Sequence, residues 1–104
     1  KYAIPQIDLV IVDLYPFEET VKNGGSAEEI IEKIDIGGIS LIRAAAKNFN
    51  DVVIIPSKHE YAEILDILKK QGAKTNIEQR KHFAERAFAT SSHYDTAIHE
   101  WFTK

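Results

Sequence analysis

Two short apolar stretches along the chain predict buried strands. Residues 7–14 read I-D-L-V-I-V-D-L, and residues 51–56 read D-V-V-I-I-P. Both are rich in β-branched side chains, and neither alternates strictly between apolar and polar positions. This pattern is typical of strands that are covered on both faces in a parallel sheet. Pro16 and Pro56 follow these stretches closely, and proline cannot continue the hydrogen-bond ladder of a strand.

Between the two predicted strands, apolar residues recur at helical spacing. Residues 22–25, K-N-G-G, predict a loop. Ser26 and Glu29 then form a capping-box pattern, which favours a short helix over about 26–34. A second helix is expected to begin after Gly37 and Gly38 and to run to about Lys47, because its apolar positions again share one face.

The second half of the chain predicts two more helices. One covers 58–71 and ends at Gly72, a residue type that commonly terminates helices. The other is long, from about 76 to 102, with apolar residues at a period of 3.6. The stretch T-S-S at 90–92 also allows a break in this helix, because three hydroxyl side chains compete for backbone hydrogen bonds.

The order of these elements predicts an α/β fold with a parallel pair of strands and helical crossovers. Two strands make a thin sheet, because sheets usually have four to six strands. We therefore expect the chain to be part of a larger α/β domain whose earlier strands are missing.

Composition narrows the functional classes. The 104 residues are 44% hydrophobic and carry a formal net charge of −3, which indicates no nucleic-acid partner and no anionic membrane partner. Cysteine is absent, which excludes disulfides, thiol catalysis and cysteine-ligated zinc. The four histidines show no metal-ligand spacing, so we expect no metal site. No apolar run is long enough to cross a bilayer and no signal-peptide pattern occurs, so a cytoplasmic protein is expected.

The stretch I-D-I-G-G at 34–38 is the first candidate for chemistry. Asp35 precedes Gly37 and Gly38, and a predicted helix follows. Glycine lets backbone N–H groups approach a ligand closely, and a helix N-terminus carries a partial positive charge. A polar heterocycle, an oxyanion or a phosphate suits such a place. A tight turn between two helices, with Asp35 as a cap, explains the same residues.

Two further groups of residues are candidates. Tyr15 lies at the carboxyl end of the first predicted strand, where open α/β sheets bind ligands, although a core tyrosine at a strand exit fits equally. Arg43 and Lys47 are four residues apart and share a helix face, as a binding pair or as a solvated face. Asp35 and Lys47 lie about 18 Å apart along a straight helix. They meet only if that helix starts late, bends or crosses the pocket, or if the partner comes from another chain.

Five segments together resemble one family, the IMP cyclohydrolase domain of the bifunctional PurH enzymes of purine biosynthesis. The segments occur in the family's order and span nearly the whole chain. They are L-Y-P-F-E-E-T at 14–20, I-D-I-G-G at 34–38, R-A-A-A-K-N at 43–48, N-I-E-Q-R-K-H-F-A-E-R-A-F at 76–88 and H-Y-D-T-A-I at 93–98.

This resemblance implies a three-layer, parallel-sheet, methylglyoxal-synthase-like (Rossmann-like) domain, of which residues 1–104 form the C-terminal part. It implies closure of the purine ring of 5-formamidoimidazole-4-carboxamide ribotide (FAICAR) to inosine monophosphate (IMP) with loss of water. No metal or organic cofactor is implied for that step. The family's transformylase domain, which uses 10-formyltetrahydrofolate, is expected to be absent, and the full protein is expected to be a homodimer.

The resemblance also implies roles for particular residues. The implied catalytic residues are Tyr15, Asp35 and Lys47. The implied substrate-binding residues are Ile36, Gly37, Gly38 and Arg43. Tyr15 is expected to hold or protonate the formyl oxygen, Asp35 to accept from the carboxamide N–H₂, and Lys47 to stabilise negative charge. The backbone after Asp35 is expected to line the base.

In the family, an earlier segment supplies the phosphate site and a further catalytic lysine, and these motifs do not occur in this chain. We therefore expect the isolated chain to be inactive. Two other interpretations stay open: a nucleotide- or phosphometabolite-binding module without turnover, and a structural or dimerisation fragment.

Overall fold

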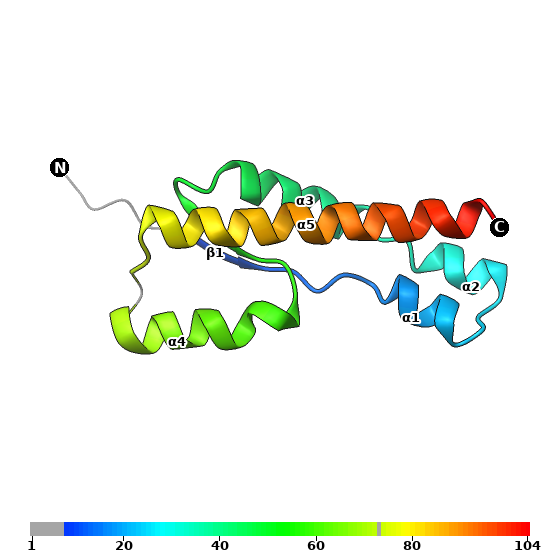
Figure 1. Ribbon diagram of the computed structural model, residues 1–104, viewed down its shortest axis with the longest axis horizontal. Helices are drawn as coiled ribbons and strands as arrows, with labels where there is room; N and C mark the ends of the chain where they lie inside the picture. Colours follow the sequence, from blue (N-terminus) through cyan, green and yellow to red (C-terminus); the bar gives the residue numbers. More distant parts are fainter. Residues whose placement is uncertain (1–7, 73) are drawn as a thin grey trace.

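The computed structural model describes residues 8–72 and 74–104, which form an elongated molecule of 55 × 24 × 18 Å. The long helix α5 runs along most of its length, with α3 on one side and α4 on the other, and α1 and α2 lie near its C-terminal half (Figure 1). The elements in chain order are β1 (Asp8–Ile11), α1 (Phe17–Lys22), α2 (Ala27–Glu32), α3 (Gly37–Lys47), β2 (Val52–Ile55), the 3-10 turn η1 (Lys58–Glu60), α4 (Tyr61–Gln71) and α5 (Ile77–Phe102).

The two strands pair in parallel, as predicted, with Asp8 opposite Val52 and Ile11 opposite Ile55. The N–H of Val12 donates to the carbonyl of Ile55 at 3.1 Å and extends the ladder by one bond. The strand predicted over 7–14 is therefore shorter in the structure, and its first residue lies outside the described residues. Residues 12–16 have no regular secondary structure and lead to α1.

The prediction that both strands are covered on both faces is correct for β2 and wrong for β1. All four residues of β2 are buried. In β1, Leu9 and Ile11 are 46% and 53% exposed, whereas Val10 packs against the core. The reason is that the described helices pack against one face of β1 only, so successive side chains alternate between core and surface.

The predicted helices occur close to their expected bounds, and α1 is an addition. Ser26 and Glu29 form both bonds of the predicted capping box at the start of α2. Helix α1 was not expected because its six residues hold only one apolar pair, Phe17 and Val21, which is too short to show a repeating period. Helix α5 is continuous through residues 90–92, so the optional break does not occur. Ser91 is buried there, and packing of that face holds the helix together.

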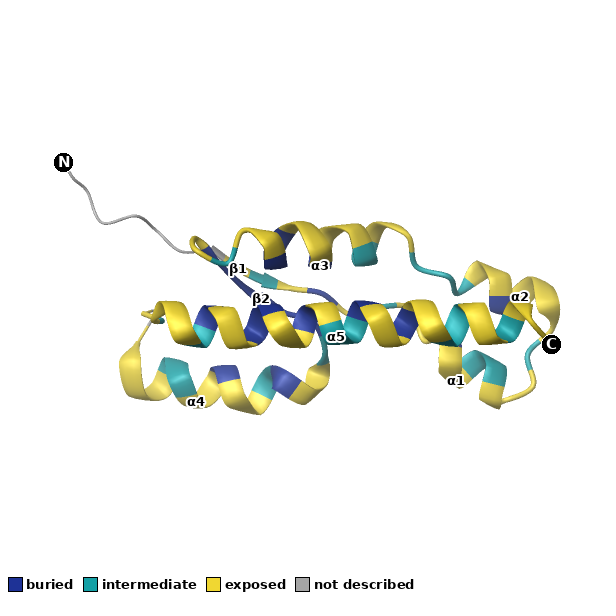
Figure 2. Cartoon of the chain, turned by 45° about the horizontal axis from the view of Figure 1, so that its top comes forward, coloured by how far each residue is buried: buried dark blue, intermediate teal, exposed yellow. Residues whose placement is uncertain are grey.

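The core consists of two clusters that α5 joins, and buried positions recur along its length (Figure 2). The larger cluster lies among β2, α3, α4 and α5 and includes Ile42, Ile54 and Phe83. The smaller cluster joins α1 and α2 to the second half of α5 through Phe17 and Tyr94. The turn that precedes α3 carries Asp35, and Ile34 and Ile39 on its two sides pack against this smaller cluster.

Candidate functional site

The carboxylate of Asp35 ties two parts of the backbone together. Its Oδ1 accepts the N–H of Gly38 at 2.6 Å, in the first turn of α3. Its Oδ2 accepts the N–H of Tyr15 at 3.1 Å, in the segment after β1. Asp35 therefore caps α3 and holds the exit of β1 beside the start of that helix. The cap that the sequence offered as an alternative is present in the structure.

The two glycines of the I-D-I-G-G stretch have different surroundings. A Cβ on Gly38 would lie 2.8 Å from Oδ1 of Asp35, which is shorter than real Cβ contacts. A Cβ on Gly37 would meet nothing within 4 Å. Gly38 therefore makes room for the carboxylate of Asp35. Gly37 leaves an open approach to the helix start, and no hydrogen bond joins its N–H or that of Ile36 to another described residue.

Tyr15 lies next to Asp35, and it is the backbone N–H of Tyr15 that makes the contact. Its side chain is 57% exposed. It lines a hollow of about 320 Å³ at the carboxyl ends of the two strands. Lys58 and His59, after β2, and His93, on α5, line the same hollow. The phenol of Tyr15 therefore faces the place where open α/β sheets bind ligands.

Tyr94 of α5 belongs to this arrangement, although the sequence indicated no role for it. Its hydroxyl accepts the N–H of Asp35 at 2.9 Å and donates to the carbonyl of Lys33 at 2.8 Å. Burial raises the pKa of the Tyr94 phenol, which therefore stays neutral and able to donate. Tyr94 occupies an apolar position of the α5 period, so a sequence pattern indicates a core residue there and nothing more.

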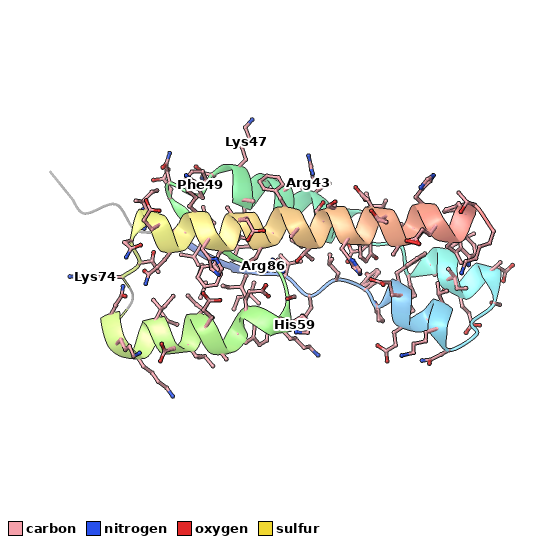
Figure 3. The ribbon with its side chains drawn as sticks, in the orientation of Figure 1. Arg43, Lys47, Phe49, His59, Lys74 and Arg86 are labelled. Atoms are coloured by element: carbon pink, nitrogen blue, oxygen red, sulfur yellow. The ribbon has the colours of Figure 1, made fainter. Side chains whose placement is uncertain are left out.

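Arg43 and Lys47 lie away from Asp35. The guanidinium carbon of Arg43 lies 5.6 Å from the ring centroid of Phe88 on α5, in a cation–π contact. Lys47 is exposed in the last turn of α3 and projects outward (Figure 3). An uninterrupted helix of this length separates its two ends by about 15 Å, so α3 does not bring Lys47 to Asp35.

Charged groups of both signs line the hollow at the strand ends. His93 Nε2 lies 2.7 Å from Glu18 Oε1, on the side of α1, and Lys58 lies on the wall formed after β2. The buried carboxylate of Glu60, 3.4 Å from Nε of Arg86, lines a neighbouring hollow that shares His93 with the first. The first hollow is therefore suited to a ligand with several polar groups.

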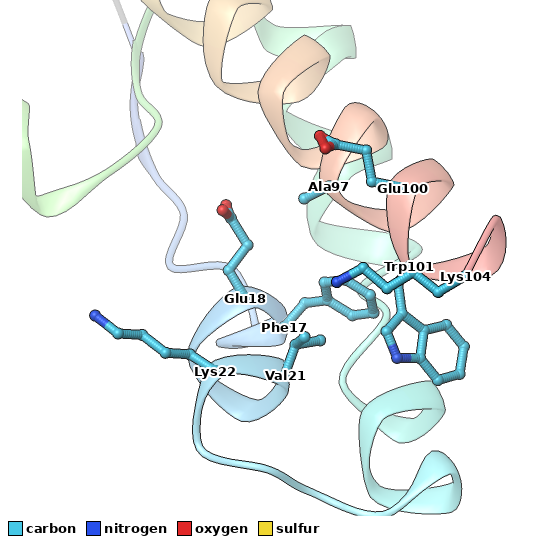
Figure 4. Close-up of a pocket in the computed structure, with 8 residues that line it drawn as sticks. All are labelled: Phe17, Glu18, Val21, Lys22, Ala97, Glu100, Trp101 and Lys104. Atoms are coloured by element: carbon cyan, nitrogen blue, oxygen red, sulfur yellow. The ribbon is translucent and has the colours of Figure 1, made fainter.

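A second hollow, of about 210 Å³, lies between α1 and the end of α5 (Figure 4). Phe17 and Trp101 form its apolar floor, and the charged side chains of Lys22, Glu100 and Lys104 surround it. It contains none of the residues predicted for catalysis or substrate binding, so we do not assign the candidate site to it.

Among residues 8–72 and 74–104, no group of three or more histidine, cysteine, aspartate or glutamate side chains is placed to hold a metal ion. Within the same described residues, no helix is long and apolar enough to cross a membrane.

Comparisons with known families match most of the chain. Residues 45–104 match the model of the AICARFT/IMPCHase bienzyme, and residues 3–40 match the model of the MGS-like domain. The first match begins within α3, between Arg43 and Lys47.

Curated relatives carry one recurring name, "Bifunctional purine biosynthesis protein PurH". The protein from Bacteroides thetaiotaomicron is 63% identical over 98% of this chain and 20% of its own length. Those from Bradyrhizobium diazoefficiens and Clostridioides difficile are 44% and 45% identical over 99% and 98% of this chain, and 19% and 20% of their own lengths. The chain thus spans about one-fifth of the length of the curated relatives it matches.

A solved structure, the crystal structure of ForH, is similar to the whole arrangement. The TM-score is 0.68 at 33% identity, over 97% of this chain and 53% of the ForH chain. The MGS-like match together with this likeness confirms the methylglyoxal-synthase-like part of the predicted fold class. The described residues themselves are mostly helical, with a two-stranded parallel sheet.

Proposed function

This chain belongs to the AICARFT/IMPCHase bienzyme family, and from that premise we propose that it forms part of the IMP cyclohydrolase of a PurH protein. In this proposal residues 1–104 are one part of a cyclohydrolase domain with a larger, three-layer parallel sheet. The formyltransferase step, with 10-formyltetrahydrofolate, belongs to other parts of the complete protein, and the protein is cytoplasmic.

The proposed reaction is the closure of the second ring of the purine. The carboxamide nitrogen of FAICAR bonds to the formyl carbon. The formyl oxygen leaves as water, with one proton from the carboxamide nitrogen and one from the formamide nitrogen. Such a reaction needs an oriented, flat substrate, a path for protons and stabilisation of the formyl oxygen. It needs no metal and no organic cofactor.

The observation that carries the proposal is the pair of hydrogen bonds from Tyr15 and Gly38 to Asp35. Two family-like segments, twenty residues apart, thereby meet at the carboxyl end of β1. Each carboxylate oxygen has two lone pairs, and the backbone uses one of each, so Asp35 retains acceptor capacity for the carboxamide N–H₂. The exposed phenol of Tyr15 is available to the formyl oxygen.

The backbone after Asp35 supplies the remaining contacts in the proposal. The N–H of Gly38 is already used by Asp35, so the N–H groups of Ile36 and Gly37 are the ones assigned to the edge of the base. Arg43 lies further along α3, and its guanidinium contacts the ring of Phe88. Its assignment to the substrate therefore rests on the family resemblance alone.

Lys47 fits the proposal only across two chains. It lies at the end of α3 opposite to Asp35 and is exposed. We therefore propose that Lys47 stabilises negative charge in the site of a second copy, within a homodimer of the complete protein. A symmetric dimer then holds two such shared sites.

The test uses the complete protein and measures IMP formed from FAICAR by chromatography. Tyr15→Phe and Asp35→Asn are each expected to lower turnover by about 100-fold or more. Tyr61→Phe and Asp66→Asn are the matched controls, because the hydroxyl of Tyr61 makes a single 3.5 Å contact, with Asp13, and Asp66 forms an exposed ion pair. Unchanged turnover in both site variants contradicts the proposal, and binding of IMP without turnover in the unaltered protein favours a binding module instead.

The shared site has its own test, subunit complementation. Lys47→Ala and Asp35→Asn proteins, each inactive, are dissociated, mixed and reassembled. A mixed dimer then has one site with both native residues, which restores up to about one-quarter of the activity of the native protein. If Lys47 acts within its own chain, mixing restores nothing.

A further inference from the structure

Tyr94 is the point at which α5 reaches the loop that carries Asp35. The residue is 6% exposed, and its ring packs against Phe17, with centroids 6.1 Å apart. Its hydroxyl accepts from the N–H of Asp35 at 2.9 Å and donates to the carbonyl of Lys33 at 2.8 Å. The carbonyl of Tyr15 lies 3.4 Å from the same oxygen.

These contacts fill the capacity of a phenol that has one hydrogen to donate. The proton goes to Lys33, since that carbonyl is 0.6 Å closer than the carbonyl of Tyr15 (3.4 − 2.8). The hydroxyl thus fixes both sides of the peptide segment that places the carboxylate of Asp35. Because α5 is a continuous helix anchored in both core clusters, this fixed point is rigid.

We propose that Tyr94 is a positioning residue for ring closure: its hydroxyl holds the backbone of Asp35 so that the carboxylate stays bound to Tyr15 and Gly38. Tyr94 does not touch the substrate in this proposal. The inference rests on the proposed function, and it adds a residue of the long C-terminal helix to the residues that control turnover.

The principal variant is Tyr94→Phe in the complete protein, which keeps the ring in place and removes only the hydroxyl. The expected result is a fall in kcat of about 10- to 100-fold, since misplacement of a reacting group by about 1 Å has costs of that order. KM is expected to stay within about threefold, because the edge of the base still meets the same backbone. Tyr61→Phe is the matched control and leaves both constants unchanged.

A double-variant comparison separates positioning from general loss of structure. If Tyr94 acts through Asp35, the hydroxyl removal has no further effect on kcat in an Asp35→Asn background. A multiplicative loss in that background overturns the inference, and so does native kcat in Tyr94→Phe. Native activity in Tyr15→Phe and Asp35→Asn overturns instead the proposed function itself, so the two failures are distinguishable.

Hydrogen exchange of the unaltered protein gives a measurement that does not depend on whether the variant folds. The amide of Asp35 is expected to exchange more slowly than the amide of Gly37, because only the former donates to the buried hydroxyl. Equal exchange at the two amides overturns the inference.

Discussion

The substitution Gly38→Ala tests the arrangement around Asp35 most directly. The new Cβ would lie 2.8 Å from Oδ1 and 2.9 Å from Oδ2 of Asp35. Because the carboxylate is the free end of a side chain, it is expected to rotate away while the backbone stays in place. The rotation removes the hydrogen bonds from the N–H groups of Gly38 and Tyr15.

The two lost bonds set the size of the effect. Loss of a helix N-cap costs about 0.5–2 kcal/mol. A hydrogen bond to a charged group contributes about 1.5–3 kcal/mol, and the lower end applies to the exposed contact with Tyr15. Replacing glycine by alanine in a helix stabilises the helix by up to about 1 kcal/mol. We therefore expect Gly38→Ala to lower the free energy of unfolding by about 1–2.5 kcal/mol.

Gly37→Ala is the matched control, because it makes the same change one residue earlier, where a Cβ meets nothing within 4 Å. It is expected to leave stability unchanged or to raise it by up to about 1 kcal/mol. Urea unfolding of the chain, followed by the fluorescence of Trp101, measures both. Trp101 reports on the relevant region because its ring contacts Phe17, at 6.3 Å between centroids.

The deciding comparison repeats Gly38→Ala in an Asp35→Ala background. Without the carboxylate there is nothing for the Cβ to displace, so the substitution should then be as harmless as Gly37→Ala. Equal stability of Gly38→Ala and Gly37→Ala in the native background, or a persistent loss in the Asp35→Ala background, would refute the reasoning.

Four further predictions concern stability. Ser26→Ala removes the cap of α2 and is expected to cost about 1 kcal/mol in urea unfolding. The backbone N–H of Ser26 donates to the carboxylate of Glu29 and lowers its pKa. The stability that this carboxylate contributes is therefore present above pH 4.5 and decreases as the pH falls below it. The loss of stability caused by E29Q should decrease over the same pH range. Ser91→Ala removes a hydroxyl that is buried without a hydrogen-bond partner among the described residues, so it should raise the thermal midpoint more than Ser92→Ala, its exposed neighbour. Arg80→Met is expected to cost about 2–4 kcal/mol, because two backbone carbonyls at 2.7 and 2.9 Å lose their charged donor, and retained stability would contradict this.

The sequence predicted the elements whose local signals agree with their packing. The capping box at Ser26 and the buried run at 52–55 each need only neighbouring residues to be recognised, and both occur as expected. Helix α1 was missed because six residues with one apolar pair are too short to show a repeating period. The optional break at 90–92 does not occur because packing of the buried residues on either side, Ala87 and Tyr94, outweighs a weak local preference.

The same distinction applies to the candidate site. Asp35 and the glycines are neighbours in sequence, so their cap was foreseeable. Tyr15 was selected because it follows the predicted strand, and its role stays a prediction. Tyr94 was not foreseeable, because its partner on the Asp35 loop lies 59 residues away. A tyrosine at an apolar helical position has the same pattern whether its hydroxyl meets solvent or a buried peptide group. The role proposed for Lys47 depends on a second chain, which no local pattern describes.

The geometry around Asp35 also bears on which kinetic constant the site controls. Its carboxylate is already held by two backbone N–H groups, and Tyr94 holds the peptide that carries it. The orientation of the Asp35 carboxylate is therefore fixed before any substrate binds, so substrate binding does not have to order this side chain. Substitutions that loosen this network without touching the base edge, such as those at Gly38 and Tyr94, should lower kcat more than they raise KM. Gly37→Ala should do the reverse, because its methyl group blocks the approach of the base and leaves Asp35 in place.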